Sequence, residues 1–232
     1  MTTNPDVASG LQSSDRRRLR GMRTRQAILV HAARVGSAEG LEAVSLQRLA
    51  GDLGISKSGL FAHFGSKEEL HLATIEAAAR IFTDEVIRPA LQVPRGVGRV
   101  WALCNSWLAY VEGGVFPGGC FFWAVAEEFD SRRPGPVRDS VLEKKNYWSY
   151  SIQRAVREAQ EAGEIDSHVD PEQLAWELDS LLGGANSGFK GGEGAKAIER
   201  GRRAIRDRLS RAATANAPPL GRDPTSSSPS TS

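Results

Sequence analysis

Arginine is the residue type that most clearly suggests chemistry near the N-terminus. Six arginines lie between Arg16 and Arg25, and the segment from Met1 to Lys67 has ten Lys or Arg residues against five Asp or Glu. A basic patch of this size is an electrostatic footprint for phosphate groups. Charge alone is equally consistent with a solvated or lipid-facing tail, so it leaves the partner of this patch open.

Two other groups of residues could carry chemistry. Asp166, His168 and Asp170 alternate along the chain, but Asp170 is explained as a helix N-cap, and one histidine with one spare carboxylate is poor metal ligation. Cys120 follows two glycines at a helix start, where a thiolate could be stabilised; a buried, inert cysteine is the favoured interpretation. The sequence has no nucleophile–base set, HExxH motif or phosphate-binding loop. We therefore predict no catalytic residue, no metal site and no cofactor.

The composition is that of a globular protein. The chain has 232 residues, 40% of them hydrophobic and 25% charged, with a net charge of +2. No apolar run approaches the ~20 residues that a membrane helix needs, and the arginine run is not followed by the apolar stretch of a secretory signal. Two cysteines are too few for a disulfide framework and suit a reducing cytoplasm. We expect a cytoplasmic protein that makes no contact with a membrane.

The periodicity of apolar residues is helical nearly everywhere, so the predicted fold class is all-α. The first helix should run from Thr24 to Glu39 and end at Gly40, which tolerates a left-handed backbone. Ser45, Ser56 and Ser66 are expected N-caps of the next three helices. The last of these should continue to about Arg88.

A second helical region should follow the breaks at Pro89, Pro94 and Gly96. Its first helix should bury one stripe of residues: Val97, Val100, Trp101, Cys104, Trp107, Leu108 and Val111. Further helices are expected over residues 120–129, 136–162, 171–190 and 194–213.

Residues 45–64 have the features of a helix-turn-helix. Such a motif needs a small residue where its helices touch, which Ala50 supplies, and a residue that accepts positive φ in the turn, which Gly54 supplies. Apolar residues should wedge the pair onto the first helix: Leu49, Leu53, Ile55 and Leu60. The outer face of the third helix then carries small or basic groups able to approach a major groove: Lys57, Ser58, Gly59 and Phe61.

The stretch from Thr24 to Leu72 resembles the DNA-binding domain of the TetR family of repressors. The resemblance rests on Ser45-Leu46-Gln47-Arg48-Leu49-Ala50 and on Leu60-Phe61-Ala62-His63-Phe64-Gly65-Ser66-Lys67-Glu68-Glu69-Leu70. It implies a homodimer that binds double-stranded DNA at a palindromic operator and is released by a small ligand. Family members usually have tyrosine where this chain has Phe61, and that hydroxyl commonly touches a phosphate, so this contact is in doubt.

The resemblance also implies roles for individual residues. Ser45, His63 and Lys67 would meet phosphates, helped by the dipoles of adjoining helix N-termini. Lys57, Ser58 and Gly59 would lie nearest the bases. Arg16 to Arg20 form either a disordered tail or an arm that reaches into the minor groove, as homeodomain arms do.

The domain boundaries follow from these patterns. We expect a disordered basic arm over residues 1–20, a three-helix helix-turn-helix domain over 21–66, a larger helical ligand-binding and dimerisation domain over 67–214, and a disordered tail over 215–232. All five tryptophans lie after Arg99. Aromatic residues at helical spacing are usually core, but the glycine-rich break around Gly118 favours a cavity for an apolar or aromatic effector. The residues expected to line this cavity are Trp101, Cys104, Trp107, Phe121 and Trp148.

By the same resemblance, the helices over 171–190 and 194–213 would form a four-helix bundle with their symmetry mates. Gly183, Gly184 and Ala185 would permit that approach, or would instead accommodate a helix of the same chain. The leading hypothesis is a ligand-released repressor. The alternatives are an architectural DNA-binding protein or activator without a ligand, which would bind with little sequence preference, and an all-α enzyme whose helix-turn-helix is only a scaffold.

Overall fold

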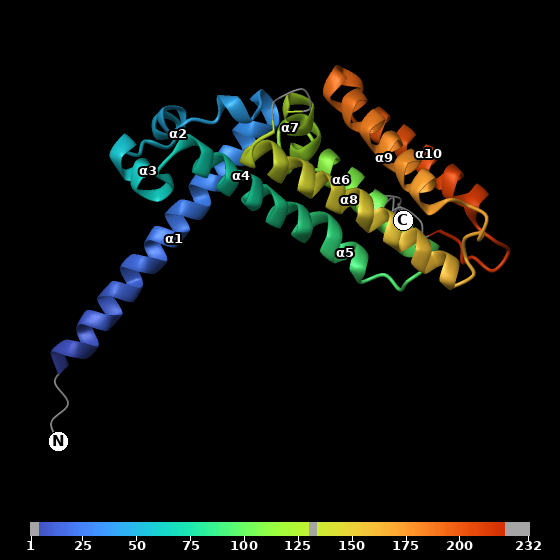
Figure 1. Cartoon of the computed structure of the whole chain (residues 1–232), viewed down its shortest axis with the longest axis horizontal. Helices are drawn as coiled ribbons and strands as arrows, with labels where there is room; N and C mark the ends of the chain where they lie inside the picture. Colours follow the sequence, from blue (N-terminus) through green and yellow to red (C-terminus); the bar gives the residue numbers. More distant parts are fainter. Residues whose placement is uncertain (1–4, 130–133, 221–232) are drawn as a thin grey trace, which may run out of the picture.

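The computed structural model describes residues 5–129 and 134–220 (Figure 1). Within these residues the elements are helices, and the only β-type pairing is an isolated antiparallel bridge between Ile165 and Ala213. This confirms the predicted all-α class. None of the helices in this part of the chain has the length and apolar character needed to cross a bilayer.

The N-terminal part consists of α1 (Pro5–Glu39), the short 3-10 helix η1 (Leu41–Ala43), α2 (Leu46–Leu53) and α3 (Lys57–Phe64). The predicted caps are present: the Ser45 hydroxyl accepts a hydrogen bond from the Arg48 N–H, and the Ser56 hydroxyl accepts one from the Gly59 N–H, each at 3.1 Å. Gly54 ends α2 in the left-handed conformation, with φ of 63°. The helix-turn-helix therefore forms where the sequence placed it.

α1 begins much earlier than the apolar periodicity predicted. The structure makes it a helix from Pro5, whereas we expected a start near Thr24 and a disordered arm over residues 1–20. Among the α1 side chains that the structure describes, from Arg16 onward, the first buried one is Ile28. The turns before it have no apolar stripe for the sequence pattern to detect. Leu, Arg, Met and Gln have good helix propensity, so the helix extends N-terminally from its packed part, and Figure 1 shows this extension projecting away from the rest of the molecule.

The larger part of the chain begins with α4 (Lys67–Phe82), whose N-cap Ser66 accepts a hydrogen bond from the Glu69 N–H at 3.0 Å. A π-helical segment, η2 (Thr83–Ile87), joins it to α5 (Arg88–Leu91), so the predicted fourth helix is interrupted by a π-turn that its sequence did not indicate. The remaining elements are α6 (Val97–Glu112), α7 (Phe121–Phe129), α8 (Pro136–Glu161), α9 (Pro171–Gly188), η3 (Phe189–Glu193) and α10 (Ala195–Ala212).

α6 runs through the centre of this second part and packs against α8, α9 and α10. Every residue of its predicted stripe is buried: Val97, Val100, Trp101, Cys104, Trp107, Leu108 and Val111. The core continues from there across α7 and α1 into the N-terminal helices, because Phe121 on α7 and Leu29 on α1 belong to one buried cluster. The two parts therefore share a hydrophobic core.

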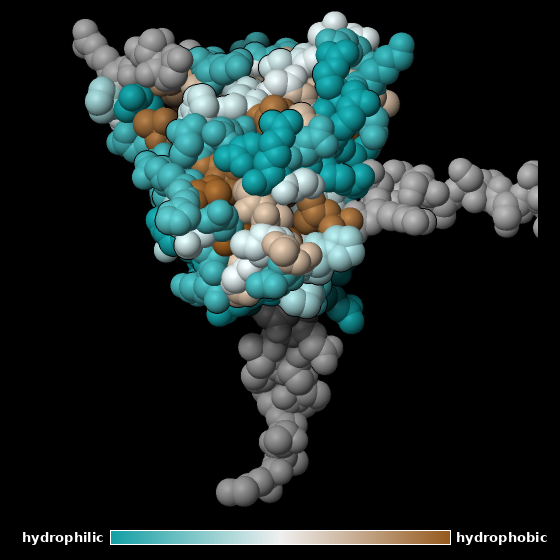
Figure 2. All heavy atoms as spheres, turned by 90° about the vertical axis from the view of Figure 1, so that its right-hand side faces the viewer, coloured by the Kyte–Doolittle hydropathy of each residue, from teal (hydrophilic) through white to brown (hydrophobic). Residues whose placement is uncertain are grey.

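α9 and α10 pack side by side, and their outer side faces the viewer in Figure 2, where pale and brown residues interrupt a mostly teal surface. The small residues predicted for a dimer contact divide between two roles. A Cβ on Gly183 would lie 2.0 Å from the Trp123 ring, so Gly183 accommodates α7 of the same chain. Gly184 is exposed, and a Cβ there would meet nothing within 4 Å.

The chain after α10 is ordered further than expected. Thr214 donates from its backbone N–H to the Glu164 carbonyl at 2.9 Å, and Ala217 and Leu220 pack against the core. The predicted disordered tail over 215–232 is therefore wrong for residues 215–220, because two of their apolar side chains, partly buried, pack against the body. Residues 221–232 lie outside the described residues.

Gly118 offers a test of how the two parts meet. An ideal Cβ at this position would lie 1.7 Å from the Ser37 carbonyl oxygen on α1. Gly118→Ala must push the loop and α1 apart, and forced overpacking costs about 1–3 kcal/mol, so the melting temperature should fall. Gly98→Ala is the control, since its Cβ would lie 3.6 Å from a Val93 methyl, an ordinary contact. Equal melting temperatures for the two variants would contradict this packing.

Candidate nucleic-acid interface and cavity

The outer face of α3 has the placement that DNA reading requires. Lys57 and Ser58 are exposed at its first turn, and Phe61 is 55% exposed one turn later. Leu60 and Phe64 are buried on the opposite face. Because the helix is anchored by one face, the other is free to enter a groove.

The other predicted DNA contacts are more constrained. The Ser45 hydroxyl is already the acceptor of the α2 cap. Gly59 lies close to Ser56, whose hydroxyl would be 3.1 Å from an added Cβ. His63 is half-buried at the end of α3. The Ser58 hydroxyl lies 3.3 Å from that of Ser56. Of the predicted contacts on α3, Lys57 and Phe61 are therefore the exposed side chains without such a restraint.

Lys67 begins α4 and is half-exposed, but its ammonium group is paired. The Lys67 Nζ atom lies 2.6 Å from Oε2 of Glu42 in η1. A phosphate reaching Lys67 must compete with this carboxylate. The sequence did not reveal the pair, because the two residues are far apart in the chain.

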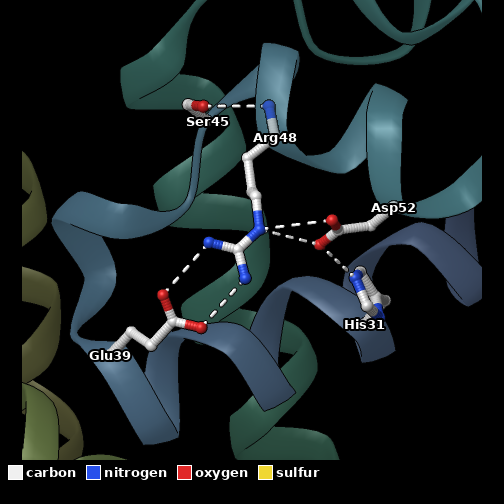
Figure 3. Close-up of polar contacts among 5 residues, drawn as sticks. All are labelled: His31, Glu39, Ser45, Arg48 and Asp52. Atoms are coloured by element: carbon white, nitrogen blue, oxygen red, sulfur yellow. Dashed lines mark hydrogen bonds and ion pairs between the residues drawn. The ribbon is translucent and has the colours of Figure 1, made fainter.

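An ion-pair network holds α2 onto α1 (Figure 3). The Arg48 guanidinium donates to both carboxylate oxygens of Glu39, at 2.9 and 3.1 Å, and its Nε atom donates to Asp52 at 3.0 Å. His31 on α1 lies 2.9 Å from the same Asp52 carboxylate. The hydrogen bond from Arg48 lowers the pKa of Glu39, and the bond from His31, followed by that from Arg48, lowers the pKa of Asp52. The network fixes the orientation of α2, which in turn positions α3.

The basic extension of α1 starts beside the recognition helix. Arg25 lies over the Phe64 ring of α3, with 4.9 Å from the guanidinium carbon to the ring centre. N-terminal to this contact, α1 presents a series of exposed arginines: Arg16, Arg18, Arg20 and Arg23. The arm is thus a helix rather than an extended tail, and its guanidinium groups lead away from the end of α3.

Two polar contacts attach the helix-turn-helix to the rest of the molecule. Glu128 on α7 accepts hydrogen bonds from the backbone N–H groups of Leu41 and Glu42, at 2.6 and 3.0 Å. His71 on α4 is buried, and its Nε2 atom lies 2.9 Å from the Val44 carbonyl oxygen. Burial lowers the pKa of His71, so the neutral ring donates this bond. Both contacts hold the segment that leads into α2.

A cavity of about 60 Å³ lies between α4, α7, α8 and α9. Its wall is largely aromatic, with one carboxylate and two ammonium groups. The residues that argue for a ligand are Phe82, Trp107, Trp123, Trp148, Lys145 and Asp179. Two predicted ligand-binding residues, Trp107 and Trp148, are among them.

The other three predicted ligand-binding residues lie elsewhere in the core. The Arg206 guanidinium carbon lies 4.8 Å from the Trp101 ring centre, so Trp101 belongs to the contact between α6 and α10. Cys104 is fully buried within α6. Phe121 packs against Phe116 and Phe122. Helical spacing placed these side chains inside the domain correctly, but it could not show which of them border a cavity.

The weaker chemical candidates have structural roles. Asp166 accepts a hydrogen bond from the backbone N–H of His168 at 2.9 Å, and Asp170 caps α9. Cys120 borders the cavity, yet burial raises the pKa of its thiol to about 11, so it stays protonated at neutral pH.

Family models match two segments of the chain. One, described as bacterial regulatory proteins of the tetR family, covers residues 28–74. The other, described as a tetracyclin repressor-like C-terminal domain, covers residues 96–205. Together they span more than half of the chain, and the unmatched residues between them, 75–95, cover the second half of α4, η2, α5 and the loop that follows. No curated protein matches the sequence significantly.

Solved structures share the fold. A TetR transcriptional regulator from Chloroflexus aurantiacus is 24% identical with a TM-score of 0.77, covering 84% of this chain and 98% of that one. A transcriptional regulator from Saccharomonospora viridis, solved with choline, is 19% identical with a TM-score of 0.65, covering 83% and 98%. AibR, solved with isovaleryl coenzyme A and operator DNA, is 21% identical with a TM-score of 0.63, covering 78% and 97%.

The Lys67–Glu42 pair yields a prediction about DNA affinity. Lys67→Ala should weaken binding to all sequences and reduce the salt slope by about one unit, because one phosphate contact is lost. Glu42→Gln should strengthen binding, because it removes the carboxylate that competes for Lys67. Fluorescence anisotropy of a labelled duplex at several salt concentrations measures both effects.

A double-mutant cycle separates this pair from a general change of charge. Glu42→Gln should strengthen binding much less when Lys67 is already alanine, whereas Glu68→Gln, an exposed carboxylate next to Lys67 in the chain, should behave the same in both backgrounds. If the Glu42→Gln effect is equal with and without Lys67, then Lys67 does not contact phosphate.

Proposed function

Because the chain belongs to the TetR family of transcriptional regulators, we propose that it is a repressor that binds a palindromic operator as a homodimer. We further propose that a small molecule in the cavity between α4, α7, α8 and α9 releases it from DNA. We propose that it acts on this operator in the cytoplasm. Catalysis is not part of this proposal, since the family consists of regulators.

The observation that carries the DNA-binding function is the exposed face of α3 on a rigid scaffold. Lys57 and Phe61 project from a helix whose other face is buried, while the Arg48 network fixes the preceding helix. Side chains that must meet base edges need such fixed positions. The proposed contacts are therefore Lys57, Ser58, Gly59 and Phe61 toward the groove, with Ser45, His63 and Lys67 toward the phosphates.

α4 supports the proposal that the cavity controls the DNA-binding face. Phe82 and Ala79 near its end border the cavity, while Lys67 at its start lies beside the helix-turn-helix. Glu76 in its middle is paired with Lys144 of α8 at 2.8 Å. A tilt of α4 driven from the cavity would move Lys67 and, in a dimer, the spacing of the two recognition helices.

Release requires that the ligand bind the non-DNA conformation more tightly than the DNA-binding one. The related structures with choline and with isovaleryl coenzyme A support a small-molecule effector here. Those two ligands differ in chemistry, so the ligand class for this chain has to be argued from its own cavity.

Selection from a random pool of duplexes tests the DNA-binding proposal. The full chain should enrich a palindrome with half-sites about one helical turn apart, or a multiple of it. It should prefer that palindrome about 10³-fold or more over unrelated duplexes. Uniform binding to all duplexes would instead favour an architectural DNA-binding protein.

The outer side of α9 and α10 is the proposed dimer surface. Gly184 faces outward from α9 and borders a groove that continues to Gly188 and Gly201. Within the protomer, a Cβ added to Gly188 would lie 2.8 Å from Ala197 of α10. A Cβ added to Gly201 would lie 2.7 Å from Ala185 of α9. The exposed Trp176 lies on the same helix as Gly184. Small residues here would let the two copies approach closely.

Gly184→Leu should therefore leave the protomer folded but weaken the dimer. The leucine meets nothing within 4 Å in its own chain, so the helical content should be kept. Sedimentation across a concentration series should show a shift toward monomer. Ser149→Leu, on the exposed face of α8, is the matched control and should remain dimeric. An unchanged dimer in Gly184→Leu would place the interface elsewhere.

A further inference from the structure

The cavity has aromatic walls and contains one carboxylate, Asp179, that is not paired with a cation. Asp179 of α9 is partly buried, and its single hydrogen bond within the described residues comes from the Trp148 indole N–H, at 2.9 Å. No Lys or Arg nitrogen of the described chain lies within ion-pair distance of it. A carboxylate has room for about four hydrogen bonds, and a buried charge without a counter-charge costs free energy. Burial accordingly raises the pKa of Asp179, although the nearby Lys145 opposes this.

The two lysines of the cavity are already engaged. Lys144 is held by two carboxylates, Glu76 at 2.8 Å and Glu143 at 3.5 Å. Lys145 lies over the Trp123 ring, with its Nζ atom 5.3 Å from the ring centre. Lys144 is paired with carboxylates and Lys145 lies over a ring, so Asp179 has no paired cation among the described residues.

The aromatic wall also favours a positively charged ligand. Ring faces carry negative potential and attract cations, and quaternary ammonium groups are recognised by several rings acting together. The Lys145 ammonium on Trp123 shows that a ring of this wall accepts a cation. The Trp148 ring, whose N–H group donates to Asp179, stands nearly perpendicular to the Phe82 ring, with ring centres 5.3 Å apart.

From these observations we propose that the effector is an organic cation, an amine or quaternary ammonium with an apolar or aromatic body, whose positive group pairs with Asp179 inside the aromatic wall. This assignment rests on the proposed function and specifies the ligand class of its cavity. The cavity volume of about 60 Å³ suits the positive head group alone, so the apolar or aromatic body must displace part of the wall.

Phenyltrimethylammonium and tert-butylbenzene test the proposal, because they have the same shape and differ by one charge. Quenching of tryptophan fluorescence in the full chain, backed by calorimetry, should show about tenfold tighter binding of the cation. Asp179→Asn should abolish that preference and leave the neutral compound unaffected. Asp84→Asn removes an equal charge from an exposed residue on η2 and should bind as the wild type does.

A second variant keeps the test decisive if Asp179→Asn folds poorly. Lys145→Met removes the ammonium that occupies the Trp123 ring and opposes a cation near Asp179, so the affinity for phenyltrimethylammonium should rise severalfold. Equal binding of the two compounds, or binding of benzoate that is lost in Lys145→Met, would overturn the cation assignment.

The same preparation separates this proposal from the proposed function. If the chain selects a palindromic duplex but the cation neither binds nor weakens the complex, the ligand class is wrong and the DNA-binding function stands. If the cation binds through Asp179 but no duplex is selected, the cavity assignment stands and the repressor function fails.

Discussion

One carboxylate joins the entrance of the helix-turn-helix to the helix that lines the cavity. Glu128 near the end of α7 accepts the N–H groups of Leu41 and Glu42. The 3-10 helix that these residues begin has no side-chain cap of its own, because glycine precedes it. Unpaired N–H groups at a helix start are costly when partly buried, so Glu128 supplies what the local sequence lacks. Since Phe122 and Trp123 of α7 border the cavity, α7 is a direct connection between ligand and DNA-binding surfaces.

α4 provides a second connection, and the two together restrict how the parts can move. His71 holds the loop before α2 through the Val44 carbonyl, three residues from where Glu128 holds its start. Further along α4, the Phe82 ring packs edge-on against Tyr110 of α6, Phe122 of α7 and Trp148 of α8. Such aromatic pairs each contribute about 0.5–1.5 kcal/mol beyond their buried area. Phe82 therefore couples the position of α4 to those of α6, α7 and α8.

The features that the sequence predicted well are local ones. Ser45, Ser56 and Ser66 cap their helices through contacts three residues away, and Gly54 turns the chain through its own backbone, so the pattern contains all the information needed. The α1 extension was missed for the opposite reason: its sequence has no apolar stripe, and apolar periodicity detects only such stripes. The cavity wall, the Lys67–Glu42 pair and the Glu128 cap depend on side chains far apart in the chain. No single-sequence pattern specifies which of Trp101, Trp107 and Trp148 will border an open space.

The small size of the cavity determines how ligand binding can move the surrounding helices. Small-molecule sites typically enclose about 300–1,000 Å³, whereas this one measures about 60 Å³. A ligand with a body larger than its head group must therefore displace part of the wall. Two residues of the wall differ in how they are packed. Tyr147 is exposed, so its side chain can move without disturbing the core, whereas Phe82 is buried and belongs to α4. A ligand that extends toward Tyr147 fits without disturbing α4, while one that extends toward Phe82 separates it from three rings and tilts the helix that carries Lys67. Only a difference in the ligand's affinity for two conformations shifts the balance between them. The direction in which the body of the ligand extends therefore decides whether binding releases DNA, and tight binding alone does not.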